Sequence, residues 1–219
     1  MQYPHGRILV FCKAPLPGQV KTRLAEAIGQ EAATTIHVHL ACHCLRVAVN
    51  AQLAPVTLFC APDVDHEFFQ ACRKEWGVCL QSQHGRDLGE RMQHAVEESL
   101  QQSSPVLVIG TDCPAITADY LRTAMVFASK GDTVIGPAED GGYVLLAMKE
   151  PRSELFTDID WGTSQVYAQT LARISGKVNK LDDLWDVDRL VDVRRLREDA
   201  DQLGLDDGFQ VCLQALDIG

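Results

Sequence analysis

The chain has 219 residues, the length of one ordinary domain, and 46% of them are hydrophobic, a fraction typical of globular proteins. Its 20 basic and 30 acidic residues give a net charge of −10, which argues against a nucleic acid as the partner. No stretch approaches the ~20 apolar residues of a membrane span, and no apolar signal segment is visible. We therefore expect a single cytoplasmic domain over residues 1–219, with its eight cysteines reduced.

The first predicted unit is a strand, a tight loop and a helix. Ile8–Cys12 is an apolar run typical of a buried parallel strand, and two prolines and Gly18 then force a turn before a helix predicted over Val20–Ile28. Residues 1–25 carry four basic and no acidic side chains, so the other 194 residues carry 16 basic and 30 acidic ones, or −14. A positive loop on an acidic protein indicates a local anion site, because ligands of open α/β sheets bind where strands end and helices begin. The alternative is a solvated basic turn. The basic side chains around the loop are Lys13, Lys21 and Arg23.

A helical region is predicted from Ala25 to about Ala51. His39 and His43 stand at i and i+4, a spacing that can hold a metal, but no distant ligand pair with zinc spacing accompanies them. We interpret the segment as a packed helix. The chain then continues through a strand, a short helix and a brief strand, at Val56–Cys60, Asp65–Trp76 and Val78–Leu80.

The next helix is predicted to begin after Asp87, its N-cap, and to run to about Gln101. Gly89 lies in the first turn, where glycine is unfavourable. Two interpretations stay open for this glycine: a nucleoside approaches the backbone closely, or the helix packs tightly on a neighbour. On the first interpretation Leu88 and Gly89 contact the base.

Pro105–Ile109 is the clearest buried strand, and Asp112 follows it. A carboxylate directly after a parallel strand lies at the ligand edge of the sheet. Mg²⁺ and Mn²⁺ prefer carboxylate oxygens together with substrate phosphate. We therefore predict Asp112 as a metal ligand, the alternative being a carboxylate that only caps its turn. Thr117 is predicted to cap a helix over Ala118–Ser129.

Two strands, Thr133–Ile135 and Val144–Met148, flank an Asp-Gly-Gly turn that is typical of a hairpin. Asp140 and Tyr143 are expected near the same sheet edge. An acid placed there could orient the hydroxyl of an acceptor, so Asp140 is the candidate base.

The last part of the chain offers a second pair of carboxylates. A helix is predicted up to Ser175, capped by Thr163 or Ser164, and Trp161 before it lines a pocket or belongs to the core. Asp186 and Asp188 would share one face if they lie on a strand. The alternative is an acidic loop before a helix over Val191–Leu203, with a final helix at Phe209–Leu216.

Several ordered motifs resemble a bacterial family of glycosyltransferase-A-like proteins, the radical-SAM/selenodomain-associated transferases of the nucleotide-diphospho-sugar transferase superfamily. The resemblance spans nearly the whole chain and implies a three-layer α/β/α sandwich, with a mostly parallel mixed sheet that binds a nucleotide and Mg²⁺ or Mn²⁺. The motifs are Phe11–Leu24, Asp87–Met92, Gly110–Pro114, Gly136–Tyr143 and Trp161–Thr163.

The resemblance also implies roles for individual residues. Asp112 stands where that superfamily keeps a metal-binding aspartate, and Asp188 stands where related transferases have a second ligand. The family's tail reads Asp-x-Asp-Thr-Pro-Glu-Asp-Leu, whereas this chain lacks the Thr-Pro-Glu portion, which leaves Asp186 as an alternative second ligand. The candidate acceptor-binding residues are Tyr143 and Trp161. The candidate nucleotide-binding residues are Lys13, Gly18, Lys21, Arg23, Leu88, Gly89 and Arg91.

Three functions follow as hypotheses. The first is a metal-dependent glycosyltransferase that uses a nucleotide sugar and a small-molecule acceptor, with Lys21 and the metal stabilising the leaving diphosphate and Asp140 taking the acceptor's proton. The second is a nucleotidyltransferase that takes a nucleoside triphosphate and releases pyrophosphate, because Lys21–Leu24 also resembles the loop of phospholactate guanylyltransferases. The third is a nucleotide-binding module without turnover.

Overall fold

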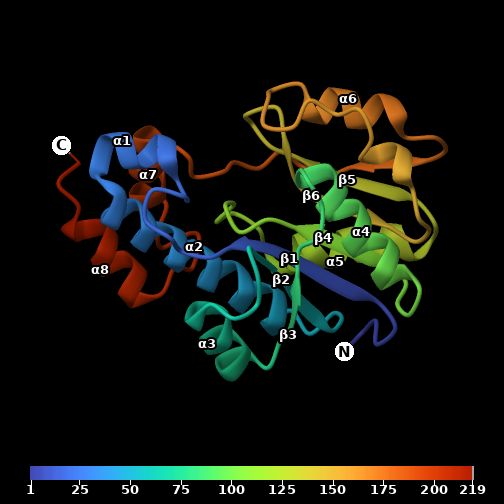
Figure 1. The fold of residues 1–219 in the computed structure, drawn as a ribbon, viewed down its shortest axis with the longest axis horizontal. Coiled ribbons are helices and arrows are strands. Elements are labelled where there is room, and N and C mark those ends of the chain that lie inside the picture. Colours follow the sequence, from blue (N-terminus) through green and yellow to red (C-terminus); the bar gives the residue numbers. More distant parts are fainter. Residues whose placement is uncertain (219) are drawn as a thin grey trace.

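The computed structural model describes residues 1–218, and its centre is a seven-stranded sheet in the order β3-β2-β1-β4-β6-β5-β7 (Figure 1). Strand β6 runs antiparallel to both of its neighbours, while the other pairings are parallel. The predicted mostly parallel mixed sheet is therefore confirmed. The strands are β1 (Arg7–Lys13), β2 (Val56–Ala61), β3 (Cys79–Ser82), β4 (Val106–Ile109), β5 (Thr133–Pro137), β6 (Tyr143–Met148) and β7 (Val178–Lys180).

Helices cover both faces of the sheet, which completes the predicted three-layer sandwich. The helices are α1 (Thr22–Ile28), α2 (Gln30–Asn50), α3 (Glu67–Trp76), α4 (Leu88–Leu100), α5 (Ala118–Ser129), the 3-10 turn η1 (Ser153–Leu155), α6 (Val166–Arg173), α7 (Leu190–Glu198) and α8 (Asp207–Ala215). Among the described residues, no helix is long and apolar enough to cross a membrane.

Strand β1 shows why the sheet is buried on both faces. Ile8 and Val10 pack into the core that α2, α3 and α5 share with the sheet. Leu9 and Phe11 pack into the opposite core, with α4 and η1. Since side chains alternate along a strand, an unbroken apolar run is what a central strand of a three-layer fold requires.

A third core lies beside the sheet and joins the two ends of the chain. It contains Leu24 of α1 and Ile36 of α2, packed with Val193 of α7 and Phe209 of α8. In Figure 1 these helices form the group at the left, where blue and red ribbons meet. This core fixes where α1 begins, and so fixes the loop between β1 and α1.

Several predicted boundaries were wrong. The first helix ends at Ile28, as predicted, but Gly29, with φ 83°, interrupts the helical region expected from Ala25, so α2 begins only at Gln30. Helix α6 begins at Val166 after Gln165, so neither Thr163 nor Ser164 is its N-cap. Helix α7 ends at Glu198, short of Leu203. The aspartates at 186 and 188 lie in a loop and not on a strand, and the three-residue strand β7 carries no apolar pattern that could have predicted it.

Candidate functional site

The loop after β1 delivers Lys21 to the carboxyl edge of the sheet. Gly18 takes a positive φ of 76°, and Lys21 itself is left-handed, with φ 47° and ψ 41°, at the N-cap of α1. A non-glycine residue in this region is uncommon and costs free energy. The conformation turns the Lys21 side chain inward, where it is only 2% exposed.

Lys21 contacts two carboxylates that come from distant parts of the sequence. Its Nζ lies 2.5 Å from Asp112 Oδ1, just after β4, and 3.3 Å from Asp188 Oδ1, just before α7. Arg23 Nη1 lies 3.8 Å from the other oxygen of Asp188. The basic loop and Asp112 were expected to lie close enough to share a ligand. The structure brings them closer still, because Lys21 and Asp112 form a direct ion pair.

The ionisation of these groups follows from their mutual charges. Burial acts to lower the pKa of Lys21, but the negative charges of Asp112 and Asp188 outweigh it and raise that pKa above its ordinary value. Burial likewise acts to raise the pKa of Asp112, and the Lys21 ammonium outweighs it and lowers that pKa. For Asp186, burial and the charge of Asp112 outweigh the opposing effect of Lys21 and raise its pKa to about 8. Of the three aspartates at this edge, Asp112 and Asp188 form ion pairs with Lys21, and Asp186 is left out of this cluster.

Helix α2 anchors both loops of the site through side chains that the sequence did not single out for this role. His37 Nε2 lies 2.9 Å from the Lys13 carbonyl oxygen, and His43 Nε2 lies 3.0 Å from that of Pro114. The Cys44 thiol donates to the Gly110 carbonyl at 3.2 Å. These bonds fix the turn that carries Asp112. The His39 ring instead stacks on Phe209, so the two histidines of the i, i+4 pair serve different partners.

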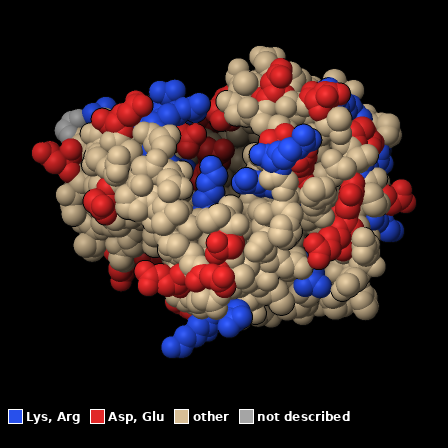
Figure 2. Space-filling view, viewed as in Figure 1, with Lys and Arg blue, Asp and Glu red and all other residues tan. Residues whose placement is uncertain are grey.

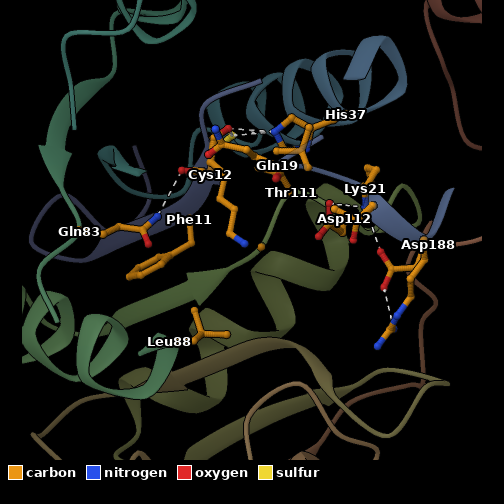
Figure 3. A pocket seen from close by; sticks show the side chains of 15 residues that line it. Phe11, Cys12, Gln19, Lys21, His37, Gln83, Leu88, Thr111, Asp112 and Asp188 are labelled. Carbon is orange, nitrogen blue, oxygen red and sulfur yellow. Dashed lines mark hydrogen bonds and ion pairs between the residues drawn. The ribbon is translucent and has the colours of Figure 1, made fainter. Parts of the chain in front are cut away.

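A first cavity of about 440 Å³ opens over this edge (Figure 3). Lys21, Asp112 and Asp188 lie toward one side of the view in Figure 3, and the apolar side chains of Phe11 and Leu88 lie toward the other. The cavity is thus charged at one end and apolar at the other, as a nucleoside phosphate requires. Its other lining residues are Cys12, Lys13, Gln19, Val20, Thr22, Arg23, His37, Gln83, Gly110 and Thr111.

A second cavity of about 520 Å³ adjoins the first, and the two share Phe11, Arg23, Leu88, Gly110 and Asp188. Three predicted residues, Asp140, Tyr143 and Trp161, line it together with Asp186 and Arg189. In the space-filling view of Figure 2, acidic and basic side chains gather around a hollow in this face of the molecule. The two cavities provide adjoining places for two ligands, or for two parts of one.

Within the second cavity, Asp140 and Tyr143 differ in what they can offer. Asp140 is exposed, and its Oδ1 accepts from the Gly142 amide at 2.8 Å, which leaves Oδ2 available. The Tyr143 hydroxyl is buried with no hydrogen-bond partner among the described residues. Burial raises the pKa of Tyr143, against the opposing effect of the nearby Thr170 hydroxyl. Tyr143 therefore contributes its ring, which lies edge-on to Trp161, while its hydroxyl is buried near Thr170.

Three predicted nucleotide-binding residues line neither cavity. Gly18 lies against the Gln30 side chain, and Arg91 donates to the Gly85 carbonyl at 3.1 Å. A Cβ at Gly89 would lie 2.7 Å from the Phe156 carbonyl oxygen and 2.7 Å from Trp161 Cε2. The structure thus favours the packing interpretation of Gly89, because the place of its missing side chain is filled by protein.

Gln83 is a cavity residue that the sequence reading missed. Its Nε2 donates to the carbonyls of Cys12, at 3.2 Å, and Phe59, at 2.8 Å, which fixes the amide at the apolar end of the first cavity. No motif flagged it, because its role depends on the pairing of β3 with β2. The sequence indicates Asp186 only as an alternative metal ligand, because an acidic stretch does not predict which of its side chains is buried.

A preformed metal cage is not part of this site. Within residues 1–218, no group of three or more His, Cys, Asp or Glu side chains is arranged to hold a metal ion. Asp112 and Asp188 nevertheless point at one position, which the Lys21 ammonium occupies. Two carboxylates are the usual protein share of a Mg²⁺ site that is completed by substrate phosphate and water.

Comparison with known proteins gives one family and several similar folds. Residues 44–163 match the profile of DUF2064, described as "Uncharacterized protein conserved in bacteria". Among curated proteins, none matches this chain. A "putative nucleotide-diphospho-sugar transferase" from Desulfovibrio desulfuricans G20 is 28% identical, with a TM-score of 0.84 over 96% of this chain and 94% of that one.

More distant structures share the fold alone. CMP:2-keto-3-deoxy-manno-octonic acid synthetase complexed with CTP is 10% identical, with a TM-score of 0.55 over 90% of this chain and 99% of that one. Rv0371c from Mycobacterium tuberculosis H37Rv, in complex with manganese, is 15% identical, with a TM-score of 0.55 over 88% and 98% of the two chains. These likenesses place the chain in the nucleotide-diphospho-sugar transferase fold.

Proposed function

Since this chain belongs to the bacterial DUF2064 family and has the nucleotide-diphospho-sugar transferase fold, we propose that it is a metal-dependent glycosyltransferase with a nucleotide sugar as donor. The observation that carries the proposal is the meeting of Lys21, Asp112 and Asp188 in the first cavity, with Asp188 also lining the adjoining second cavity. One cavity offers a charged end and an apolar end, and the other offers a carboxylate beside aromatic rings.

The first cavity suits the nucleoside diphosphate part of the donor. Phe11 and Leu88 present apolar surface for the base, while Lys13, Lys21 and Arg23 surround the place for the phosphates. Breakage of the bond between sugar and phosphate leaves additional negative charge on the diphosphate. Cations fixed at that end stabilise this charge as it develops, which lowers the barrier.

Asp112 and Asp188 fit a Mg²⁺ or Mn²⁺ ion that arrives with phosphate, because both carboxylates already converge on one cation position. When bound, the ion supplies positive charge to the departing diphosphate. Manganese in the distant relative Rv0371c supports the choice of metal and is a property of that protein.

The second cavity suits the sugar and the acceptor. The free oxygen of Asp140 faces this space and serves as the base for the acceptor hydroxyl. The rings of Tyr143 and Trp161 supply apolar surface for the sugar or acceptor. Pyrophosphate release from a nucleoside triphosphate would favour the alternative nucleotidyltransferase, which the fold shared with a CTP-bound synthetase also supports.

The test is ligand-dependent thermal stability of the wild type and of Asp112→Asn. At a nucleotide concentration of 100 Kd, binding to the folded state alone stabilises by about 2.7 kcal/mol, which raises the Tm of a chain of this size by about 5–10 °C. The panel contains the diphosphates and the triphosphates of the four common nucleosides, together with UDP-, GDP- and CDP-sugars. Each ligand is tested with and without Mn²⁺. We expect a Mn²⁺-dependent shift in the wild type that Asp112→Asn abolishes.

The matched control is Asp132→Asn. Asp132 also pairs with a lysine, Lys177 at 3.0 Å, but it precedes β5 and so lies at the opposite edge of the sheet. Its replacement should leave the nucleotide shift unchanged. A Mn²⁺-dependent shift that survives in Asp112→Asn would remove the metal role of Asp112. A wild type that responds to no nucleotide would refute the proposed function.

A further inference from the structure

The Lys21 ammonium occupies the position where the two candidate metal ligands converge. Its Nζ lies 2.5 Å from Asp112 Oδ1 and 3.3 Å from Asp188 Oδ1, and Figure 3 shows the three side chains turned toward one another. The Lys21 side chain is 2% exposed, while those of Asp112 and Asp188 are 47% and 39% exposed. The lysine is therefore enclosed, and the carboxylates keep an open side toward the cavity.

The lysine is built into this position by the backbone. Its left-handed conformation at the start of α1 directs the side chain inward, and α1 is held by the third core through Leu24. The two carboxylates within ion-pair distance stabilise the charged ammonium form of Lys21. A second cation close to it is opposed by charge repulsion unless an anion enters as well.

We propose that Lys21 is a resident counter-ion that prevents Asp112 and Asp188 from binding a free divalent cation. Lys21 releases Asp112 and Asp188 from their ion pairs only when a diphosphate group enters the first cavity and pairs with the lysine instead. Metal and phosphate consequently bind as a unit. The inference rests on the proposed function, because it assumes that the site takes a metal with a nucleotide.

The other charged groups around the pair do not change this expectation. Arg23 lies 3.8 Å from Asp188, while Lys13 and His37 act on Asp112 in the same direction as Lys21. Asp186 also lies at this edge, where it lines the second cavity together with Asp188. It is not among the ion-pair partners of Lys21, so removal of the lysine leaves Asp112 and Asp188 as the groups that gain free oxygens.

The experiment measures protein-bound Mn²⁺ by the enhancement of water-proton relaxation, without any assay of turnover. Wild type, Lys21→Met and Lys177→Met are titrated with Mn²⁺ alone. Lys177 is a matched control because it pairs with Asp132 at the other edge of the sheet. We expect Lys21→Met to bind Mn²⁺ alone at least tenfold more tightly than the wild type, and Lys177→Met to behave as the wild type.

A second titration adds inorganic pyrophosphate, a diphosphate without a base. Pyrophosphate should bring Mn²⁺ onto the wild type and should have little effect on Lys21→Met, which lacks the phosphate partner. If Lys21→Met does not fold, Lys21→Gln takes its place, because the amide keeps hydrogen-bond donors for the carboxylates while losing the charge.

The outcomes separate the two claims. Equal affinity of the wild type and the Lys21 variant for Mn²⁺ alone overturns the counter-ion role, whatever pyrophosphate does. A wild type that acquires no Mn²⁺ with pyrophosphate, and shows no nucleotide shift in the thermal assay, refutes the proposed function. In that case a tenfold gain in Lys21→Met still supports the counter-ion role.

Discussion

Gly89 offers a sharp test of how the site is supported, because its missing side chain makes room for another part of the chain. A Cβ at this position would lie 2.7 Å from both the Phe156 carbonyl oxygen and Trp161 Cε2, and still closer to Trp161 Nε1. Contacts this short force the neighbours to move. Gly89→Ala therefore pushes the segment from Phe156 to Trp161 away from α4.

The expected magnitude combines two opposing terms. Overpacking of a filled site costs about 1–3 kcal/mol, while alanine in place of glycine within a helix gains about 0.5–1 kcal/mol. The net effect is a loss of about 1–2 kcal/mol in the free energy of unfolding. For a protein of this size, that lowers the Tm by about 3–6 °C.

Gly208 is a matched control, since it also stands second in a helix, after the N-cap Asp206 and the first residue of α8, Asp207. A Cβ at Gly208 would meet no atom closer than 3.4 Å. Gly208→Ala should therefore raise the free energy of unfolding by about 0.5–1 kcal/mol, through helix propensity alone. Urea unfolding of both variants measures the difference.

The double variant Gly89→Ala/Trp161→Ala adds a check on the cause. The Trp161 contacts disappear in it, while the Phe156 carbonyl contact stays, so part of the Gly89→Ala cost should be recovered as a coupling energy. Equal stability of Gly89→Ala and Gly208→Ala would refute the packing argument. A loss of nucleotide affinity at unchanged stability would instead restore the nucleoside-contact interpretation.

Two other predictions concern the supports of the site. Burial and the nearby Arg46 lower the pKa of His43, so the unfolded chain binds more protons below the ordinary histidine pKa of about 6.5 and stability falls as the pH drops through that value. Urea unfolding of His43→Gln at pH 7.5 and 5.5 should show a smaller loss than the wild type, and an identical loss would contradict the assignment. The Arg195 guanidinium lies 4.3 Å from the centre of the Trp185 ring and its Nη1 lies 2.9 Å from Glu139 Oε2, so Arg195→Ala should cost about 1 kcal/mol. Arg122→Ala, which breaks an exposed pair within α5, should cost less than about 0.5 kcal/mol by the same measurement, and equal costs would argue against the link between α7 and the β5–β6 turn.

The sheet, and the placing of Lys21 and Asp112 at one edge of it, could be predicted from the sequence because both depend on local patterns. The apolar runs of β1 and β4 predict central strands, and the rule that ligands bind at carboxyl ends brings Lys21 and Asp112 to one edge. Their direct contact was beyond that rule. It depends on the left-handed conformation of Lys21, which neither propensity nor spacing indicates.

What the sequence could not supply depends on packing between distant segments. Gly89 is a glycine because of Trp161, which lies 72 residues later in the chain and reaches α4 only through the folded loop between them. The Tyr143 hydroxyl is buried near Thr170 of α6, and no hydroxyl-bearing motif reveals such burial. Side-chain orientation thus limited the site prediction more than the choice of residues did.

The third core has a consequence for the order in which parts of the protein can fold during translation. Leu24 is synthesised early, whereas Val193 and Phe209, which share its core, lie far later in the sequence. Before Asp188 and α7 have been synthesised, α1 lacks these packing partners, and Lys21 can pair only with Asp112. A chain shortened before α7 can thus form the central sheet and still lack the packing that holds α1 in place.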